Sequence, residues 1–258
     1  MHTRESLRCD LDLLGVLPTD TLLVHASGRS VGEVDGGIEA ILDAFTEYLR
    51  PGLLAMPALS WNSVDASHPE FDVLRTPSCV GALAEHFRLR PGVQRSWHPT
   101  HSVCALGEEA SPFTDGHERF DTPCSRLSPW GRLLDRRAKI LFLGTGLSCN
   151  TFLHGVEEWC GVPGSLTETR QALITLTPDG ARLPVPSRRH SGGRSKHYAK
   201  MEDVFARSGA TTVGRFGDAR CHLADSVRME AVTRRLLDAD IDLFGHDRVP
   251  TWAGEVFT

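Results

Sequence analysis

The sequence lacks several features that would place a protein outside the cytoplasm or in a membrane. Its seven cysteines are an odd number, and none of them forms a C-x-x-C pair, which favours reduced thiols over a disulfide framework. No uninterrupted apolar run approaches the roughly 20 residues of a membrane-spanning helix. The first residues, MHTRESLRCDLDLLGV, lack the apolar core of a signal peptide. We therefore predict a cytoplasmic protein that does not associate with membranes.

The chain also lacks an excess of positive charge. Its net charge is −5 at pH 7, so the overall charge gives no indication of a nucleic-acid partner. Hydrophobic residues make up 40% and charged residues 24% of the 258 residues, which is close to the average of globular proteins. A chain of this length suits one large α/β domain. We predict a single domain over residues 1–258.

Alternating apolar patterns predict the fold class. The first sixty residues show a strand at 21–24, a glycine-rich loop, a helix that begins at Ile38 and a strand at 53–56, which is a βαβ unit. We predict an α/β fold with a mixed, mostly parallel sheet flanked by helices. Further strands are predicted at 103–106, 139–144 and 211–216, a hairpin at 173–176 and 182–185, and helices at 4–14, 79–89, 150–160, 197–208 and 224–238, with a helical turn at 130–134.

The loop from His25 to Gly37 follows a strand and precedes a helix. Glycines at such a position let backbone N–H groups approach an anion, such as a pyrophosphate, at the helix N-terminus. The loop matches neither G-x-G-x-x-G nor G-x-x-x-x-G-K-[ST]. An ordinary glycine-rich turn therefore remains the alternative interpretation.

Histidines are concentrated in two further stretches. His98 and His101 flank Pro99 in R-S-W-H-P-T-H-S, but no third ligand stands at a familiar spacing, so we predict no metal site. On a helix that begins near Asn150, an expected N-cap, His154 faces the carboxylates three and four positions later. A carboxylate beside an imidazole raises its basicity, as a general base requires. A surface ion pair is the alternative.

These stretches, taken in order, resemble the aminoglycoside 3-N-acetyltransferase family, whose antibiotic acetyltransferase fold is distinct from the GCN5-related fold. The resemblance rests on six segments spread over nearly the whole chain: D-T-L-L-V-H-A-S-G-R-S-V-G-E-V-D-G-G (20–37), F-D-V-L-R-T-P-S-C-V-G-A-L-A-E (71–85), R-S-W-H-P-T-H-S-V-C-A-L-G (95–107), S-P-W-G-R-L (128–133), L-G-T-G-L-S-C-N-T-F-L-H-G-V-E-E (143–158) and V-G-R-F-G-D-A-R-C-H-L (213–223).

The resemblance implies an acetyl-CoA-dependent N-acetyltransferase that acts on a small-molecule amine, and it assigns residues to roles. Catalysis falls to His154 as general base and Glu157 as its partner. The amine attacks the thioester directly, although Cys149 or Cys160 could serve as an acyl carrier. Residues expected to bind CoA are His25, Ser27, Ser30, Gly32, Gly36, Gly37, Ser102, Val103 and Ser128. A monomer or a homodimer is expected.

The stretch after Pro186 departs from the family pattern, because S-R-R-H-S-G-G-R-S-K-H (187–197) is basic where the resistance enzymes are acidic. A cationic loop would repel a polycationic aminoglycoside and attract a phosphate or a carboxylate. The acceptor is therefore either an aminoglycoside-like amine or an anionic amine of a biosynthetic pathway. A solvated loop, a clamp for the CoA 3′-phosphate and a non-catalytic CoA-binding protein are further alternatives. Candidate contacts to the substrate are Asp72, His98, Glu158 and His190, with Asp218 as a further acidic candidate.

Overall fold

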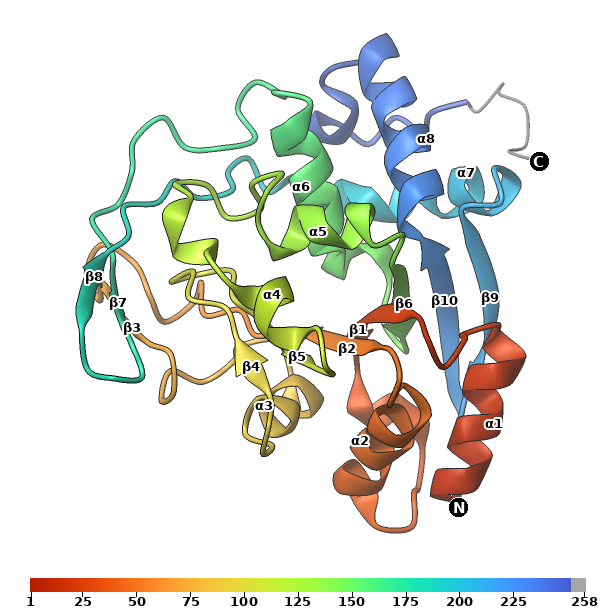
Figure 1. Cartoon of the computed structure of the whole chain (residues 1–258). Helices are drawn as coiled ribbons and strands as arrows, with labels where there is room; N and C mark the ends of the chain where they lie inside the picture. The colour runs from red at the N-terminus through yellow and green to blue at the C-terminus, as the bar shows by residue number, and fades with distance from the viewer. Residues whose placement is uncertain (252–258) are drawn as a thin grey trace.

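The computed structural model describes residues 1–251, and its centre is a sheet of seven strands in the order β4-β5-β2-β1-β6-β10-β9 (Figure 1). The two pairings of β1, with β2 and with β6, are parallel, and the other four pairings are antiparallel. The predicted mixed α/β fold is confirmed, but a mostly parallel sheet was the wrong expectation. The strands are β1 (Thr21–Ala26), β2 (Leu53–Pro57), β4 (Gln94–Arg95), β5 (Val103–Leu106), β6 (Lys139–Leu143), β9 (Thr211–Phe216) and β10 (Ala219–Asp225).

The antiparallel part of the sheet includes a hairpin that the sequence pattern did not predict. Strand β9 was expected, but β10 was not, although β10 lies between β6 and β9. A two-residue turn at Gly217 and Asp218 joins the two strands. Gly217 has φ +59°, and a Cβ there would lie 2.5 Å from the carbonyl oxygen of Val31. This tight turn therefore requires glycine, and it reverses the chain so that β10 runs antiparallel to β9.

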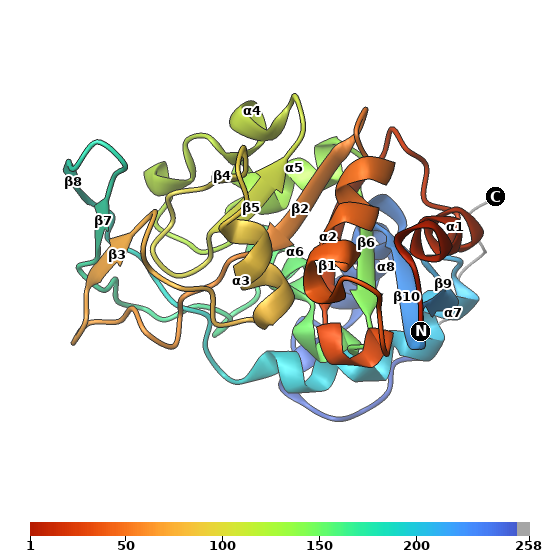
Figure 2. The same ribbon diagram turned by 90° about the horizontal axis from the view of Figure 1, so that it is seen from below.

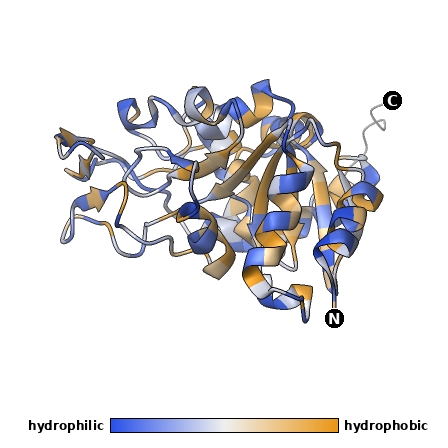
Figure 3. Ribbon diagram, turned by 60° about the horizontal axis from the view of Figure 1, so that its bottom comes forward, coloured by the Kyte–Doolittle hydropathy of each residue, from blue (hydrophilic) through white to orange (hydrophobic). Residues whose placement is uncertain are grey.

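Helices cover both faces of the large sheet (Figure 2). Leu22 and Val24 of β1 pack on one face with three helices, whereas Leu23 points to the opposite face, as the period of two along a strand requires. Hydrophobic residues therefore concentrate in the strands, and the outward sides of the helices are hydrophilic (Figure 3). The first face carries α1 (Arg4–Leu14), α2 (Gly37–Tyr48) and α3 (Ala82–Arg88), and the second α4 (Ala110–Thr114), α5 (Pro129–Asp135), α6 (Thr151–Trp159), α7 (Glu202–Arg207) and α8 (Ser226–Ala239).

A small three-stranded sheet lies apart from the large one, at the left of Figure 1. It contains β3 (Glu70–Asp72), β7 (Ile174–Leu176) and β8 (Arg182–Pro184), and its β7–β8 pair confirms the predicted hairpin. Short 3-10 turns complete the chain: η1 (Gly28–Val31), η2 (His117–Arg119), η3 (Leu147–Cys149), η4 (Arg194–Met201) and η5 (Leu243–Gly245). No helix within residues 1–251 has the length and apolar character needed to span a bilayer.

Candidate active site

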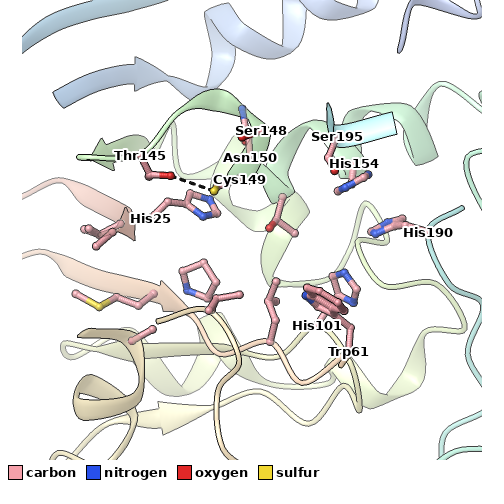
Figure 4. A pocket seen from close by; sticks show the side chains of 18 of the residues that line it. His25, Trp61, His101, Thr145, Ser148, Cys149, Asn150, His154, His190 and Ser195 are labelled. Atoms are coloured by element: carbon pink, nitrogen blue, oxygen red, sulfur yellow. Dashed lines mark hydrogen bonds between the residues drawn. The ribbon is translucent and has the colours of Figure 1, made fainter. Parts of the chain in front are cut away.

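A cavity of about 460 Å³ opens where β1, β2 and β6 end (Figure 4). Since β1 connects to β2 on one side and lies beside β6 on the other, this is the edge at which open α/β sheets bind ligands. Its walls combine an apolar surface with imidazoles and hydroxyls. The lining residues are Val24, His25, Ala26, Met56, Pro57, Leu59, Trp61, Val80, Ala84, His101, Thr145, Ser148, Cys149, Asn150, Thr151, His154, Arg189, His190 and Ser195.

Helix α6 carries His154 into this cavity and joins it to Glu157 through a third residue. The hydroxyl of Tyr198 lies 2.7 Å from Nδ1 of His154 and donates its one proton to Oε2 of Glu157. Nδ1 of His154 must therefore donate to the tyrosine oxygen, which leaves the lone pair on Nε2. Nδ1 also lies 3.6 Å from Oε2 of Glu157. The structure thus brings the predicted catalytic pair together, with Tyr198 as the bridge.

Glu157 is fully buried and ionised. Burial by itself would raise its pKa, but the neighbouring His154 and the hydrogen bonds from Tyr198 and Arg194 outweigh burial and hold the pKa below its ordinary value. Arg194 donates through Nε to Oε1 of Glu157 and, at 3.1 Å, through Nη1 to Asp242. The side chain of Arg194 is only 6% exposed. Glu157 is therefore a negative charge fixed beneath the tyrosine.

A second imidazole–carboxylate pair lies against the first. The ring of His190 stacks on the ring of His154, with centroids 4.1 Å apart and planes 10° apart. Oε1 of Glu158 accepts a hydrogen bond from the backbone N–H of Cys124 at 2.9 Å and lies 2.7 Å from Nε2 of His190. Because that oxygen already accepts, Nε2 of His190 is its donor. Glu158 therefore anchors the ring that packs on His154.

Burial sets the protonation of these groups. It lowers the pKa of His154 to about 4, with the neighbouring His190 adding to the effect, and it lowers the pKa of His190 to about 4 as well. Both imidazoles are therefore neutral at pH 7. Burial also raises the pKa of Glu158 to about 7. The side chain of Glu158 is 4% exposed and does not line the cavity, so the predicted contact of Glu158 with the substrate is not what the geometry favours; His190 does line the cavity.

Cys124, Glu158 and His190 are also the residues that could best hold a metal. Their potential ligand atoms lie within 4.8 Å of one another, the one such group within the described part of the chain. Two of these residues are already joined by the 2.7 Å hydrogen bond between Glu158 and His190. We therefore interpret the group as a hydrogen-bonded support.

The glycine-rich loop lines a second hollow of about 540 Å³, which shares Ala26 with the cavity. Ser27, Gly32 and Gly37 line this hollow, and His25 lines the cavity itself. Two other predicted residues shape the loop instead. Ser30 donates to the backbone carbonyl of Ser27 at 2.6 Å, and Gly36 has φ +81° at the start of α2. The structure thus places the predicted CoA-binding loop along two adjoining depressions that meet at Ala26.

Three other residues predicted to bind CoA lie behind the cavity wall. Ser102 donates to the carbonyl of Ala58 at 2.6 Å and accepts from Nε of Arg95. Val103 is buried in β5, and the hydroxyl of Ser128 accepts from the backbone N–H of Trp130 as the N-cap of α5. None of the three lines the cavity or the hollow, because each is already committed to the sheet or to a helix end. His101, from the same stretch as Ser102, does line the cavity.

Two predicted substrate contacts, Asp72 and His98, also lie away from the cavity lining. Asp72 accepts at 2.9 Å from the backbone N–H groups of Leu74 and Arg75, so it closes a turn next to the small sheet. His98 is completely buried, and its Nε2 lies 3.1 Å from the hydroxyl of Ser187. The acidic candidate Asp218 is exposed, and its carboxylate bonds to His2. These three side chains support the structure around the site.

Sequence reasoning missed Tyr198 and the role of Arg194. The chain has only two tyrosines, and one of them, Tyr198, directly follows the basic stretch, of which only the charge was interpreted. Arg194 of that stretch bonds to Glu157, and Lys200, just after it, donates to the carbonyls of Leu243 and His246. This part of the chain therefore largely supports the site from within. A tyrosine next to a run of charged residues, in a chain with few tyrosines, was the sequence feature that could have indicated Tyr198 as a site residue.

The amino end of α6 also differs from its prediction. Asn150 occupies the N-cap position, but its side chain does not cap the helix and donates to the sulfur of Met229 at 3.2 Å instead. Asn150 and Thr151 both line the cavity. The positive end of the helix dipole therefore opens on the cavity, which favours negative charge there.

Comparisons with known proteins agree with this geometry. The sequence model of the family described as aminoglycoside 3-N-acetyltransferase matches residues 23–238. Aminoglycoside N(3)-acetyltransferase VIII of Streptomyces fradiae is 32% identical over 259 residues, which cover 88% of this chain and 89% of that protein. The aminoglycoside N(3′)-acetyltransferase-like protein YokD of Bacillus subtilis (strain 168) is 28% identical, with 86% and 87% covered.

Solved structures give the same result. The structure of AAC-IIIb binary with CoASH matches with a TM-score of 0.81 and 27% identity, and the match covers 92% of this chain and 96% of that one. A mutant of aminoglycoside acetyltransferase AAC(3)-IVa in complex with a gentamicin matches with a TM-score of 0.83 and 27% identity, with 94% and 91% covered. The resemblance drawn from the sequence is thereby confirmed: the chain belongs to the aminoglycoside 3-N-acetyltransferase family.

Proposed function

We propose that this protein transfers the acetyl group of acetyl-CoA to an amine of a small molecule. The observation that carries the proposal is the chain of hydrogen bonds from His154 through Tyr198 to Glu157, which leaves a basic nitrogen in a cavity that adjoins the hollow lined by the glycine-rich loop. A relative whose structure contains CoASH supports CoA as the carrier. Relatives named as aminoglycoside N(3)-acetyltransferases support an amine as the acceptor.

The proposed reaction begins when the neutral amine attacks the thioester carbonyl. Attack makes the amine nitrogen more acidic, and its proton passes to Nε2 of His154. Glu157 stabilises the resulting imidazolium across Tyr198, which offsets the burial that lowers the pKa of this imidazole to about 4. The tetrahedral intermediate then collapses, its C–S bond breaks, and the CoA thiolate leaves and takes the proton from His154, which restores the neutral base. The products are the N-acetylated amine and CoA.

The surroundings of His154 are suited to both charges that develop. The positive charge on the imidazole faces the fixed negative charge of Glu157 across the Tyr198 hydroxyl. The negative charge on the carbonyl oxygen would develop near the amino end of α6, where Asn150 and Thr151 line the cavity. Both interactions strengthen as the transition state forms, which is what accelerates a reaction.

A thiol-release assay tests this proposal. The protein is mixed with acetyl-CoA and a panel of amines that includes kanamycin, gentamicin, simple alkylamines and amino acids, and free CoA thiol is followed while products are identified by mass. We expect amine-dependent release with N-acetylated product. Binding of CoA without release for any amine would contradict the proposal and favour a non-catalytic CoA-binding protein.

A control addresses the cysteine alternative. Cys149 lines the cavity and accepts a hydrogen bond from the hydroxyl of Thr145 at 3.0 Å, so it is the cysteine best placed to carry an acetyl group. We expect the intact mass of the protein to stay unchanged after incubation with acetyl-CoA alone, and Cys149→Ser to retain turnover.

A further inference from the structure

We propose that the acceptor is a compact amine that also carries an oxyacid group, a carboxylate or a phosphate, and that Arg189 binds this group. The proposal rests on the acetyl transfer proposed above and names the class of its acceptor. It follows from the composition of the cavity, from the surroundings of Arg189 and from the place of Arg189 relative to His154.

The cavity is poorly suited to a polycation. Its lining among the described residues contains no aspartate and no glutamate, and many of its members are apolar. Apart from Arg189, its polar members are hydroxyls, an amide, a thiol and ring N–H groups. Burial lowers the pKa of His154 and of His190 to about 4 and puts that of His101 well below its ordinary value, so these rings are neutral. An acceptor with several ammonium groups would find no carboxylate on these walls.

Arg189 supplies a positive charge to the same lining. Its Nη1 donates to the carbonyl of Val64 at 3.0 Å and to the amide oxygen of Gln171 at 3.3 Å, and its Nη2 donates to the carbonyl of Trp61. All three acceptors are neutral. Within residues 1–251, no carboxylate oxygen forms a salt bridge with Arg189; the half-exposed carboxylate of Asp65 interacts with it only over a longer range.

This arrangement fits an anion-binding group. The three neutral acceptors hold the guanidinium in one orientation without cancelling its charge. A guanidinium has five N–H donors, so donors remain for a ligand. Carboxylates and phosphates are the groups that arginine binds best, through short, charge-assisted hydrogen bonds. Arg194, in the same basic stretch, and Lys200, just after it, differ, because Arg194 bonds to carboxylates and Lys200 donates to backbone carbonyls.

The position of Arg189 indicates that the acceptor is small. Arg189 precedes His190, whose ring lies 4.1 Å from that of His154, and all three residues line one cavity. An acceptor that places its amine at Nε2 of His154 can reach the guanidinium only within this cavity. A short chain between the amine and the oxyacid group meets this condition.

Matched pairs of acceptors test the proposal. Acetyl transfer is measured with 4-aminobutyrate against butylamine, with 3-aminopropyl phosphate against 3-aminopropanol, and with kanamycin. We expect the oxyacid member of at least one pair to have a kcat/KM about 10- to 100-fold higher than its neutral partner, as one charge-assisted contact would give. Whichever pair shows the larger ratio identifies carboxylate or phosphate as the group bound.

Variants of Arg189 assign the effect. Arg189→Gln should raise KM for the oxyacid acceptor about 10- to 100-fold, with kcat nearly unchanged, because the contact exists before and during the reaction. The preference for the oxyacid acceptor over butylamine should therefore fall to about one, and Arg189→Lys should retain part of the preference. Arg170→Gln is the matched control, because Arg170 pairs with the exposed Asp121 and does not line the cavity.

The outcomes separate this proposal from the one on which it rests. Faster transfer to kanamycin than to any oxyacid amine would overturn the acceptor class and leave acetyl transfer in place. An equal loss with every acceptor in Arg189→Gln would overturn the role of Arg189. Absence of thiol release with every amine would overturn acetyl transfer, and the acceptor class with it.

Discussion

Two neighbouring glutamates on α6 differ more in their surroundings than in their positions along the chain. Glu157 has Tyr198 and Arg194 as donors and His154 nearby, and its pKa lies below the ordinary value because these contacts outweigh burial. Glu158 receives fewer compensating contacts, and burial raises its pKa to about 7. The same side chain is thus a permanent charge at one position and a titratable group at the next.

The two glutamates therefore have different roles in the site. The charge of Glu157 reaches the general base through Tyr198, whereas Glu158 holds the ring of His190 against that base. Their effects on stability have opposite signs. Glu157 stabilises the fold above its ordinary pKa and loses this effect as pH falls through its lower folded pKa. Glu158 has the opposite effect, because its buried carboxyl resists ionisation: the free energy of unfolding falls as pH rises from the ordinary pKa of a glutamate toward about 7.

Among variants of these residues, Glu157→Gln is expected to have the largest effect on kcat. The change removes the charge that offsets the imidazolium and leaves Arg194 with Asp242 as its remaining carboxylate. We expect kcat to fall about 100- to 1,000-fold and the free energy of unfolding to fall by about 3 kcal/mol, the lower end for a broken buried ion pair. Steady-state kinetics and urea unfolding measure the two effects. Unchanged kcat in a folded variant would show that the charge of Glu157 plays no part in catalysis.

A smaller effect is expected from Tyr198→Phe, which removes the bridge but keeps both ends. Nδ1 of His154 would then have only the carboxylate 3.6 Å away, so the ring loses its fixed tautomer. We expect kcat to fall about 10- to 100-fold while the affinity for acetyl-CoA stays the same. Calorimetry measures the affinity for acetyl-CoA, and a stopped assay measures kcat. A loss of acetyl-CoA binding without a loss of kcat would contradict the role of Tyr198 as the bridge.

The smallest catalytic effect is expected from Glu158→Gln. The amide oxygen can still accept from Cys124 and His190, so we expect kcat at pH 7 to change by less than about threefold. Removing the titration should raise the free energy of unfolding at pH 7 by up to about 3 kcal/mol, from the difference between about 7 and the ordinary pKa. It should also flatten the dependence of stability on pH between about 4.5 and 7. A steeper dependence of stability on pH in the variant would contradict the assignment of this titration to Glu158.

The sequence predicted the parts of this protein that depend on local pattern. The βαβ unit, the hairpin at β7 and β8, and the pairing of His154 with Glu157 all follow from residues close in the chain. Strand β10 escaped prediction because Arg220 and His222 interrupt its apolar residues, and its place between β6 and β9 depends on pairing across the sheet. The expectation of a mostly parallel sheet failed for the same reason, since strand direction depends on connections that the βαβ unit does not reveal.

The surroundings of the site could not be read from spacing. Tyr198 lies 41 positions from Glu157, and Arg194 lies 37 positions away, so only the folded chain brings them together. Likewise, the basic stretch suggested one cationic loop, whereas folding commits Arg194 to the site's interior and leaves Arg189 on the cavity wall. Charge along a sequence does not show which charges are paired.

The most direct test of the whole account is the turnover of His154→Ala beside its affinity for acetyl-CoA. His154 contributes the basic nitrogen, and its removal leaves the glycine-rich loop unchanged. Thiol release with the best amine and calorimetric binding of acetyl-CoA are measured on the same preparation. We predict that kcat falls about 1,000-fold while the affinity for acetyl-CoA stays within about threefold of the unaltered protein. Turnover near that of the unaltered protein, with binding intact, would contradict the account.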